Sequence, residues 1–167
     1  MSNKEESLSI NFTLWQLLHR SFGAVNKVRQ KELDLYGITM RQSAVLGAVL
    51  RSGEQETPTE LAKQLFLEIN TISEQLKRME ADGLIRKVKD LNRKNLVRIE
   101  VTEKGRKLYR KTLNRKSIDY IMSVLTEEEK LELWSILVKL RGQAVKKLGI
   151  KNLDLYPPVD PAKLQLL

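Results

Sequence analysis

The sequence predicts a mainly α-helical protein that carries one small β-hairpin. Apolar residues recur at three- and four-residue steps over most of the 167 residues, which is the spacing of an amphipathic helix. Three segments open with Thr followed three residues later by Gln or Glu, a pattern that begins helices. Two short segments rich in β-branched residues, within residues 84–101, are typical of paired strands.

The first predicted helix runs from about Ile10 to Leu35 and ends before Gly37. Its apolar stripe consists of Leu14, Leu18, Phe22, Val25 and Val28, widened by Trp15 and Leu17. A second helix begins at the capping box of Thr39 and Gln42 and continues to about Leu50. A third, short helix begins at Thr57 with Pro in its first position and carries Leu61, Ala62 and Leu65.

The fourth helix is predicted over residues 70–81, after a bend at residues 66–68, with Gly83 as its C-terminal stop. Helical geometry groups the apolar Ile69, Ile72, Leu76 and Met79 on one inward face. The same geometry directs the polar side chains outward: Asn70, Thr71, Ser73, Glu74, Lys77 and Arg78.

A basic hairpin follows directly, with arms at residues 84–89 and 96–101 joined by the polar loop 90–95. A long helix is predicted from about Thr102. A last helix opens at Thr126 with an apolar stripe of Leu131, Trp134, Leu137, Val138, Val145 and Leu148. The three prolines after Lys151 indicate an extended tail. This order of elements predicts a winged helix-turn-helix lobe between terminal helices.

The positive charge is concentrated in one segment. Residues 84–116 hold thirteen Lys or Arg and three acidic residues, whereas the rest of the chain holds seventeen basic and eighteen acidic residues. A single-sign block on a surface favours a polyanionic partner over a merely solvated face. Because the block follows two helices joined by a turn, we expect that partner to be double-stranded DNA.

Composition argues against several other classes. The chain has no cysteine, which removes disulfides, thiol chemistry and Cys-ligated zinc. His19 is the single histidine and makes no transition-metal site by itself, although a carboxylate-rich site stays open, and we predict no cofactor. We find no Gly-rich phosphate loop and no nucleophile elbow, so an enzyme is not expected. No apolar run reaches membrane-spanning length and the start MSNKEESLSINFT is polar, so a cytoplasmic protein is expected.

The sequence resembles the MarR family of winged helix regulators over about Ile38 to Leu140. The segments that carry the resemblance are ITMRQSAVL, TELAKQL, ISEQLKRMEADGLI, NRKNLVRIEVTEKG and LTEEEKLEL, in that order. The resemblance implies an obligate homodimer whose terminal helices interleave, with two winged lobes on a palindromic site. Wide apolar stripes at both ends of a short chain also favour a second copy, although packing within one chain stays an alternative.

The resemblance also assigns roles in DNA binding. It implies that the polar face of the fourth helix enters the major groove and that Arg93 enters the minor groove, where Asn92 stands in place of the usual Asp. Glu74 departs from the basic residue usual in the family, so it either accepts a hydrogen bond from cytosine or points away. Further basic side chains of the wing are candidates for phosphate contacts, with some of them expected to point elsewhere: Lys94, Arg98, Arg86, Lys87 and Lys89. The basic side chains of the following helix, within residues 104–116, are expected to contact DNA only in part, because only part of one helical face can meet it.

The predicted organisation is a dimerisation helix (1–36), a DNA-binding lobe (37–102), connecting and dimerisation helices (103–150) and a tail (151–167). By analogy with the family, a small aromatic or anionic effector would bind beside the lobe. Its candidate residues are Trp15, His19, Arg20 and Phe22, although aromatic residues at helical spacing more often belong to a core. We expect a sequence-specific transcriptional regulator, most simply a repressor. The alternatives are a sequence-tolerant architectural DNA-binding protein and a protein-binding adapter, for which a neutral or acidic wing would be expected.

Overall fold

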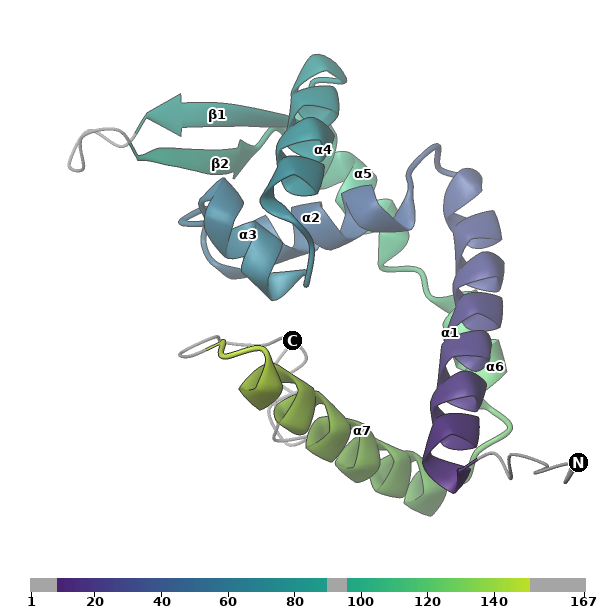
Figure 1. The fold of residues 1–167 in the computed structure, drawn as a ribbon. Coiled ribbons are helices and arrows are strands. Elements are labelled where there is room, and N and C mark those ends of the chain that lie inside the picture. Colours follow the sequence, from purple (N-terminus) through teal and green to yellow (C-terminus); the bar gives the residue numbers. More distant parts are fainter. Residues whose placement is uncertain (1–8, 90–95, 151–167) are drawn as a thin grey trace, which may run out of the picture.

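The computed structural model describes residues 9–89 and 96–150. The elements in these residues follow in chain order: α1 (Ile10–Asp34), α2 (Met40–Arg51), α3 (Pro58–Gln64), α4 (Ile69–Ala81), β1 (Ile85–Lys89), β2 (Val97–Val101), α5 (Glu103–Thr112), α6 (Lys116–Met122) and α7 (Glu127–Lys147). We call α2 to α5 with the hairpin the winged lobe, and α1, α6 and α7 the helical arm (Figure 1). The predicted winged helix order is confirmed.

The three predicted capping boxes begin helices where the sequence places them. At α2 the hydroxyl of Thr39 accepts from the amide of Gln42 at 3.1 Å, and the Gln42 side chain accepts from the Thr39 amide at 2.9 Å. Reciprocal pairs of the same kind open α3 at Thr57 and α7 at Thr126. Each box satisfies amides that the first helical turn leaves without partners, so local sequence sets these three starts.

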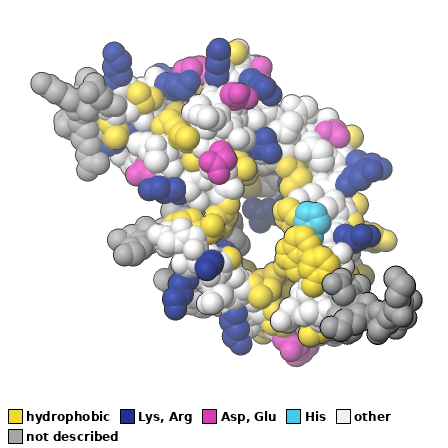
Figure 2. All heavy atoms as spheres, in the orientation of Figure 1, with side chains coloured by type: hydrophobic (Ala, Val, Ile, Leu, Met, Phe, Trp, Pro, Cys, Tyr) yellow, Lys and Arg dark blue, Asp and Glu magenta, His cyan; other side chains and the backbone are white. Residues whose placement is uncertain are grey.

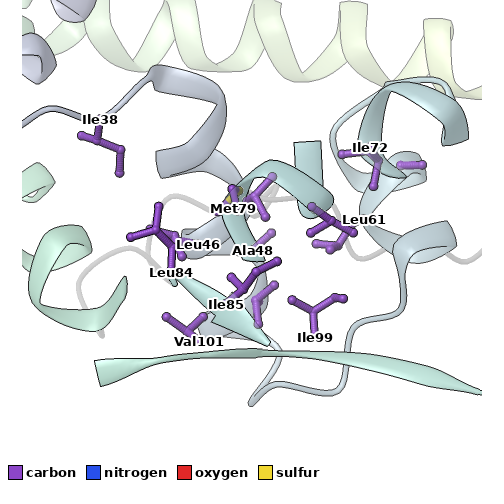
Figure 3. Close-up of a cluster of buried hydrophobic side chains, with 14 of the residues drawn as sticks. Ile38, Leu46, Ala48, Leu61, Ile72, Met79, Leu84, Ile85, Ile99 and Val101 are labelled. Atoms are coloured by element: carbon purple, nitrogen blue, oxygen red, sulfur yellow. The ribbon is translucent and has the colours of Figure 1, made fainter. Parts of the chain in front are cut away.

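The hydrophobic core lies in the winged lobe and includes Leu33 from the end of α1. In the described residues, every buried hydrophobic side chain lies between Leu33 and Val101. Figure 3 shows these side chains meeting from the helices of the lobe and from both strands. Ile72, Leu76 and Met79 of α4 are each 0% exposed, so this helix is fixed with one face inward. Ile69 is the exception to the predicted inward face, since 43% of it is exposed. It stands in the first helical position of α4, ahead of the packed part of the helix.

The hairpin is an antiparallel pair in which Ile85 lies opposite Val101 and Arg86 lies opposite Glu100. β2 is also held by the segment between α2 and α3, because the amide of Ile99 donates to the carbonyl of Glu56 at 3.0 Å. α5 begins against the hairpin at Gly105, where an added Cβ would lie 2.2 Å from the carbonyl oxygen of Leu84. Only a residue without a side chain fits this approach.

The long helix predicted from Thr102 is wrong, because the chain forms two helices, α5 and α6, separated at residues 113–115. Arg29 of α1 donates to the carbonyl of Thr112 at 2.5 Å and to that of Asn114 at 2.9 Å. These contacts satisfy carbonyl groups at the end of α5 that a continuing helix would have used itself. A residue more than eighty positions earlier therefore supports the break.

The helical arm has little core of its own. α1 lies beside α6 and α7 projects away from both (Figure 1), and neither α6 nor α7 contains a buried residue. Figure 2 shows hydrophobic side chains around the opening in the middle of the molecule. Across the described parts of the chain, no helix has both the length and the apolar character that a membrane crossing requires. The predicted tail, residues 151–167, lies outside the described residues.

Candidate nucleic-acid interface

The exposed face of α4 carries the side chains that the sequence nominates for the major groove. Asn70, Ser73, Glu74, Lys77 and Arg78 are exposed, and Thr71 is half-buried. Burial of the opposite face fixes their direction, because a helix cannot rotate without exposing its apolar stripe. Amide, hydroxyl, ammonium and guanidinium groups therefore project together from a rigid element, which is the arrangement that base-edge recognition requires.

Glu74 lies one helical turn before Arg78, and its carboxylate is 3.8 Å from the guanidinium. Both side chains are about three-quarters exposed, at 74% and 75%. An exposed i, i+4 pair of this kind contributes only about 0.3–0.5 kcal/mol, so either partner can leave it for a better one. Glu74 thus reduces the positive potential around Arg78 without locking that side chain.

The basic side chains of the hairpin divide between its two faces. The register places Arg86 and Val88 on one face, and Lys87 and Lys89 on the other. Arg86 is directly opposite Glu100, with which it forms an ion pair at 2.5 Å and a hydrogen bond from Nε at 2.7 Å. This ion pair neutralises part of the positive charge on one face of the hairpin. The alternation of side chains along the two strands is the sequence pattern that could have predicted it.

Lys87 joins the hairpin to α4. Its ammonium lies 3.1 Å from the carboxylate of Glu80, and its backbone amide donates to the same carboxylate at 3.0 Å. The hydrogen bond from the Lys87 side chain is the main reason why the pKa of Glu80 lies below its usual value. Lys87 therefore sets the position of the hairpin relative to the exposed face of α4.

Arg98, opposite Val88 near the loop end of the hairpin, holds β2 to the lobe. It is half-buried and donates to the side-chain oxygen of Gln55, in the segment between α2 and α3. Lys89 is exposed at the far end of β1. Arg93 and Lys94, the predicted tip of the wing, lie outside the described residues. The contacts of Lys87 and Arg98 with Glu80 and Gln55 were missed by the sequence analysis, because those partners come from other elements.

The effector residues predicted on α1 lie on its exposed side. Trp15 stacks between Phe12 and His19, with ring centroids 5.5 and 5.7 Å apart. Trp15, His19 and Phe22 line a shallow hollow together with Leu18. Arg20 is exposed and is not part of this lining. The hollow is apolar and open, which suits an aromatic ring or the apolar side chains of another helix.

A second hollow lies where α1, α2 and α5 meet, and the sequence analysis missed it. Arg29, Arg51 and Arg115 contribute to its lining, together with the hydroxyl groups of Ser43 and Tyr109. These residues come from distant parts of the chain, so no local pattern groups them. Three guanidinium groups beside hydroxyl groups can bind an anionic group by donating hydrogen bonds to it. Within residues 9–89 and 96–150, no cluster of three or more His, Asp or Glu side chains could hold a metal ion.

Comparison with known proteins identifies relatives of the whole arrangement. Residues 36–92 match the family model described as the MarR family. The organic hydroperoxide resistance transcriptional regulator of Bacillus subtilis is 32% identical over 114 residues, which are 68% of this chain and 77% of that protein. An uncharacterized HTH-type transcriptional regulator of Bacillus cereus is 27% identical over 142 residues, covering 83% of this chain and 94% of that one.

Two crystal structures show the same fold. The organohalide-sensing transcriptional regulator RdhR, in its 2,4-dichlorophenol-bound form, aligns with a TM-score of 0.82, 30% identity and coverage of 94% of both chains. A mutant of MarR from E. coli, complexed with operator DNA, aligns with a TM-score of 0.72 and 23% identity over 77% of this chain and 93% of that chain. At this level of identity, the similarity to MarR from E. coli shows a shared fold only.

Proposed function

Because the chain belongs to the MarR family of transcriptional regulators, we propose that it acts as a homodimeric repressor on a palindromic operator. The observation that carries this proposal is the rigid exposed face of α4 beside a basic hairpin. A recognition helix held by its own buried stripe can enter the major groove while the hairpin contacts the backbone and the minor groove. Such an assembly would act on DNA in the cytoplasm and compete with transcription for the same site.

The helical arm supports the homodimer. Leu133, Ile136, Leu137 and Leu140 form an i, i+3, i+4, i+7 stripe on α7, and each is 36–53% exposed. α1 adds a second apolar face, in which Trp15 and Leu17 are 57% and 63% exposed. Apolar helical faces of this width are stable in water when another surface buries them, and a second copy supplies an identical one. Two-fold symmetry in the protein calls for a palindrome in the DNA.

Regulation by a small molecule is part of the proposal. The relative RdhR is described with bound 2,4-dichlorophenol, an aromatic compound that can carry negative charge. In this chain the hollow around Arg29, Arg51 and Arg115 lies between the helical arm and the winged lobe, where an aromatic anion would meet both. The relative from B. subtilis is named for organic hydroperoxide resistance. This chain contains no cysteine, so thiol oxidation cannot be its signal.

The test is selection of bound fragments from genomic DNA, followed by affinity measurements over a range of salt. We expect one short palindrome, weakened about tenfold or more by Arg93→Ala, since a minor-groove arginine adds both charge and shape recognition. Lys139→Ala, which removes one positive charge from α7, is the control and should leave the affinity unchanged. Uniform, salt-sensitive binding without a preferred site would instead support the architectural alternative, and absence of binding would refute both.

A further inference from the structure

Ile69 differs from the other apolar residues of α4. Ile72, Leu76 and Met79 are 0% exposed in the core, whereas Ile69 is 43% exposed. The residue also lies outside the partly buried set that packs against the core cluster. Its side chain therefore contributes little to the stability of the lobe, and its apolar surface faces solvent in the isolated chain.

The position of Ile69 on α4 shows which way its exposed side chain faces. It is the first residue of α4, one position before Asn70 and one turn before Ser73, and both of these are exposed. Side chains at i and i+4 lie on the same side of a helix, so Ile69 borders the exposed polar face. In helix-turn-helix proteins, the N-terminal residues of the recognition helix contact base edges. Ile69 thus lies in the part of α4 that would enter the groove most deeply.

An isoleucine side chain offers only carbon and hydrogen, so it cannot hydrogen-bond to any base. The one apolar feature of a base edge in the major groove is the C5-methyl group of thymine. Cytosine, adenine and guanine present hydrogen-bond donors and acceptors there. An aliphatic side chain would remove water from these groups without giving them a new hydrogen-bond partner. The chemistry of Ile69 therefore favours one base.

We propose that Ile69 contacts the C5-methyl group of a thymine in each half of the operator and selects thymine at that position. This proposal rests on the proposed function, because it requires α4 to lie in the major groove. It adds a specificity residue to the polar set of α4 and predicts one thymine per half-site whose methyl group strengthens binding.

The experiment uses the selected operator with its thymines replaced by deoxyuridine, one symmetric pair at a time. Deoxyuridine lacks the methyl group and keeps every hydrogen-bonding group of thymine. For the wild-type protein, one pair of replacements should weaken binding about fourfold per half-site, the value of one buried methyl group. Ile69→Ala should bind the thymine and deoxyuridine operators equally. Alanine favours helix more than isoleucine does, so this variant should fold normally.

Leu35→Ala is the matched control, because it truncates an exposed aliphatic side chain at the end of α1. It should keep the full difference between thymine and deoxyuridine. The proposal is overturned if no replacement weakens the wild-type protein, or if the difference persists in Ile69→Ala. Both results leave specific operator binding intact, so they separate failure of this proposal from failure of the proposed function. A wild-type protein that selects no site would overturn both.

Discussion

The winged lobe and the helical arm differ in how they use their apolar residues. The lobe buries its apolar side chains within one chain, and nine of those between Val45 and Ile99 are under 2% exposed. The arm exposes most of them, and α7 has large hydrophobic residues at up to 60% exposure. Because burial of apolar area is the main stabilising contribution to folding, the lobe can be stable alone. The arm needs a surface that this chain does not provide.

Polar contacts join the two regions beside Leu33 of α1, which is buried in the core cluster of the lobe. Arg29 pairs with Glu32 at 2.5 Å and donates to carbonyls at the end of α5, while Ser117 of α6 donates to Glu32. Burial would raise the pKa of Glu32, but the hydrogen bonds from Ser117 and Arg29 and the positive charge of Arg29 lower it overall. The carboxylate is therefore held ionised between α1 and α6 of the arm, and it holds the Arg29 guanidinium that reaches the end of α5. A directional junction of this kind fixes the angle between the regions more strictly than apolar contact does.

The largest predicted effect comes from introducing a charge into the apolar stripe of α7. Leu140→Asp should separate the dimer and lower operator affinity by about 10²–10⁴-fold, because binding would lose the gain of linking two lobes. Sedimentation equilibrium and fluorescence anisotropy would measure the two changes. Lys139→Asp introduces the same residue one position away, outside the stripe. A dimer that survives Leu140→Asp, or one that Lys139→Asp also disrupts, would show that this stripe is not the interface.

A glycine in each region provides the next test. Gly105→Ala should lower the free energy of unfolding by about 3 kcal/mol, because its Cβ would meet the carbonyl oxygen of Leu84 at 2.2 Å. Gly142→Ala in α7 meets no atom within 4 Å and should leave stability unchanged or raise it by up to about 1 kcal/mol. Denaturant titration would measure both. Equal effects at the two positions would contradict the assignment of tight packing to the lobe alone.

The junction should show an intermediate effect. Arg29→Ala should destabilise the protein by about 2 kcal/mol, since it removes the charged partner of the Glu32 carboxylate and the side-chain donor to two carbonyl groups. Arg29→Lys should restore less than half of the lost stability, because one ammonium group cannot donate to all the acceptors that the planar guanidinium group reaches. Thermal unfolding would compare the three proteins. Full rescue by lysine would show that charge alone, and not the fork of hydrogen bonds, joins arm and lobe.

The features predictable from sequence are those set by neighbouring residues. Thr39 with Gln42 specifies a helix start within four residues, and the period of Ile72, Leu76 and Met79 specifies which face of α4 is buried. The outward residues of α4 follow from the same period. Sequence also places the basic charge on the hairpin, because the count needs no coordinates.

The features that sequence missed depend on distant partners. The break between α5 and α6 has no glycine or proline to mark it, and the contacts that support it come from Arg29. The contacts of Lys87 with Glu80 and of Arg98 with Gln55 also come from other elements, and the phosphate contacts expected of both side chains stay a prediction. The exposure of Ile69 was also missed, since its spacing matches the buried stripe and only the packing at the start of α4 leaves it outside.

The smallest effect concerns Glu56, a buried carboxyl of the lobe. Burial raises its pKa, with the charge of Glu60 adding to the rise and the hydrogen bond from Gln64 and the charge of Arg51 opposing it. A raised pKa in the folded state means that stability falls as pH rises from the ordinary carboxyl value through the folded value. Glu56→Gln should therefore be more stable than wild type at pH 7, on the order of 0.5 kcal/mol.

This advantage of Glu56→Gln should disappear as the pH falls below the ordinary carboxyl range, where Glu56 is protonated in both states. Thermal unfolding at several pH values would measure it, with Glu128→Gln on the exposed side of α7 as the control for loss of one negative charge. An advantage that is the same at every pH would contradict a cost arising from the ionised carboxylate.

In the proposed dimer, two winged lobes recognise DNA while the helical arms hold them together. The most direct measurement compares the selected operator with a duplex in which one half-site is scrambled, by sedimentation for stoichiometry and anisotropy for affinity. We expect two chains per intact duplex and an affinity about 10²–10⁴-fold lower on the scrambled duplex. One chain per duplex, with equal affinity for both DNAs, would contradict this expectation.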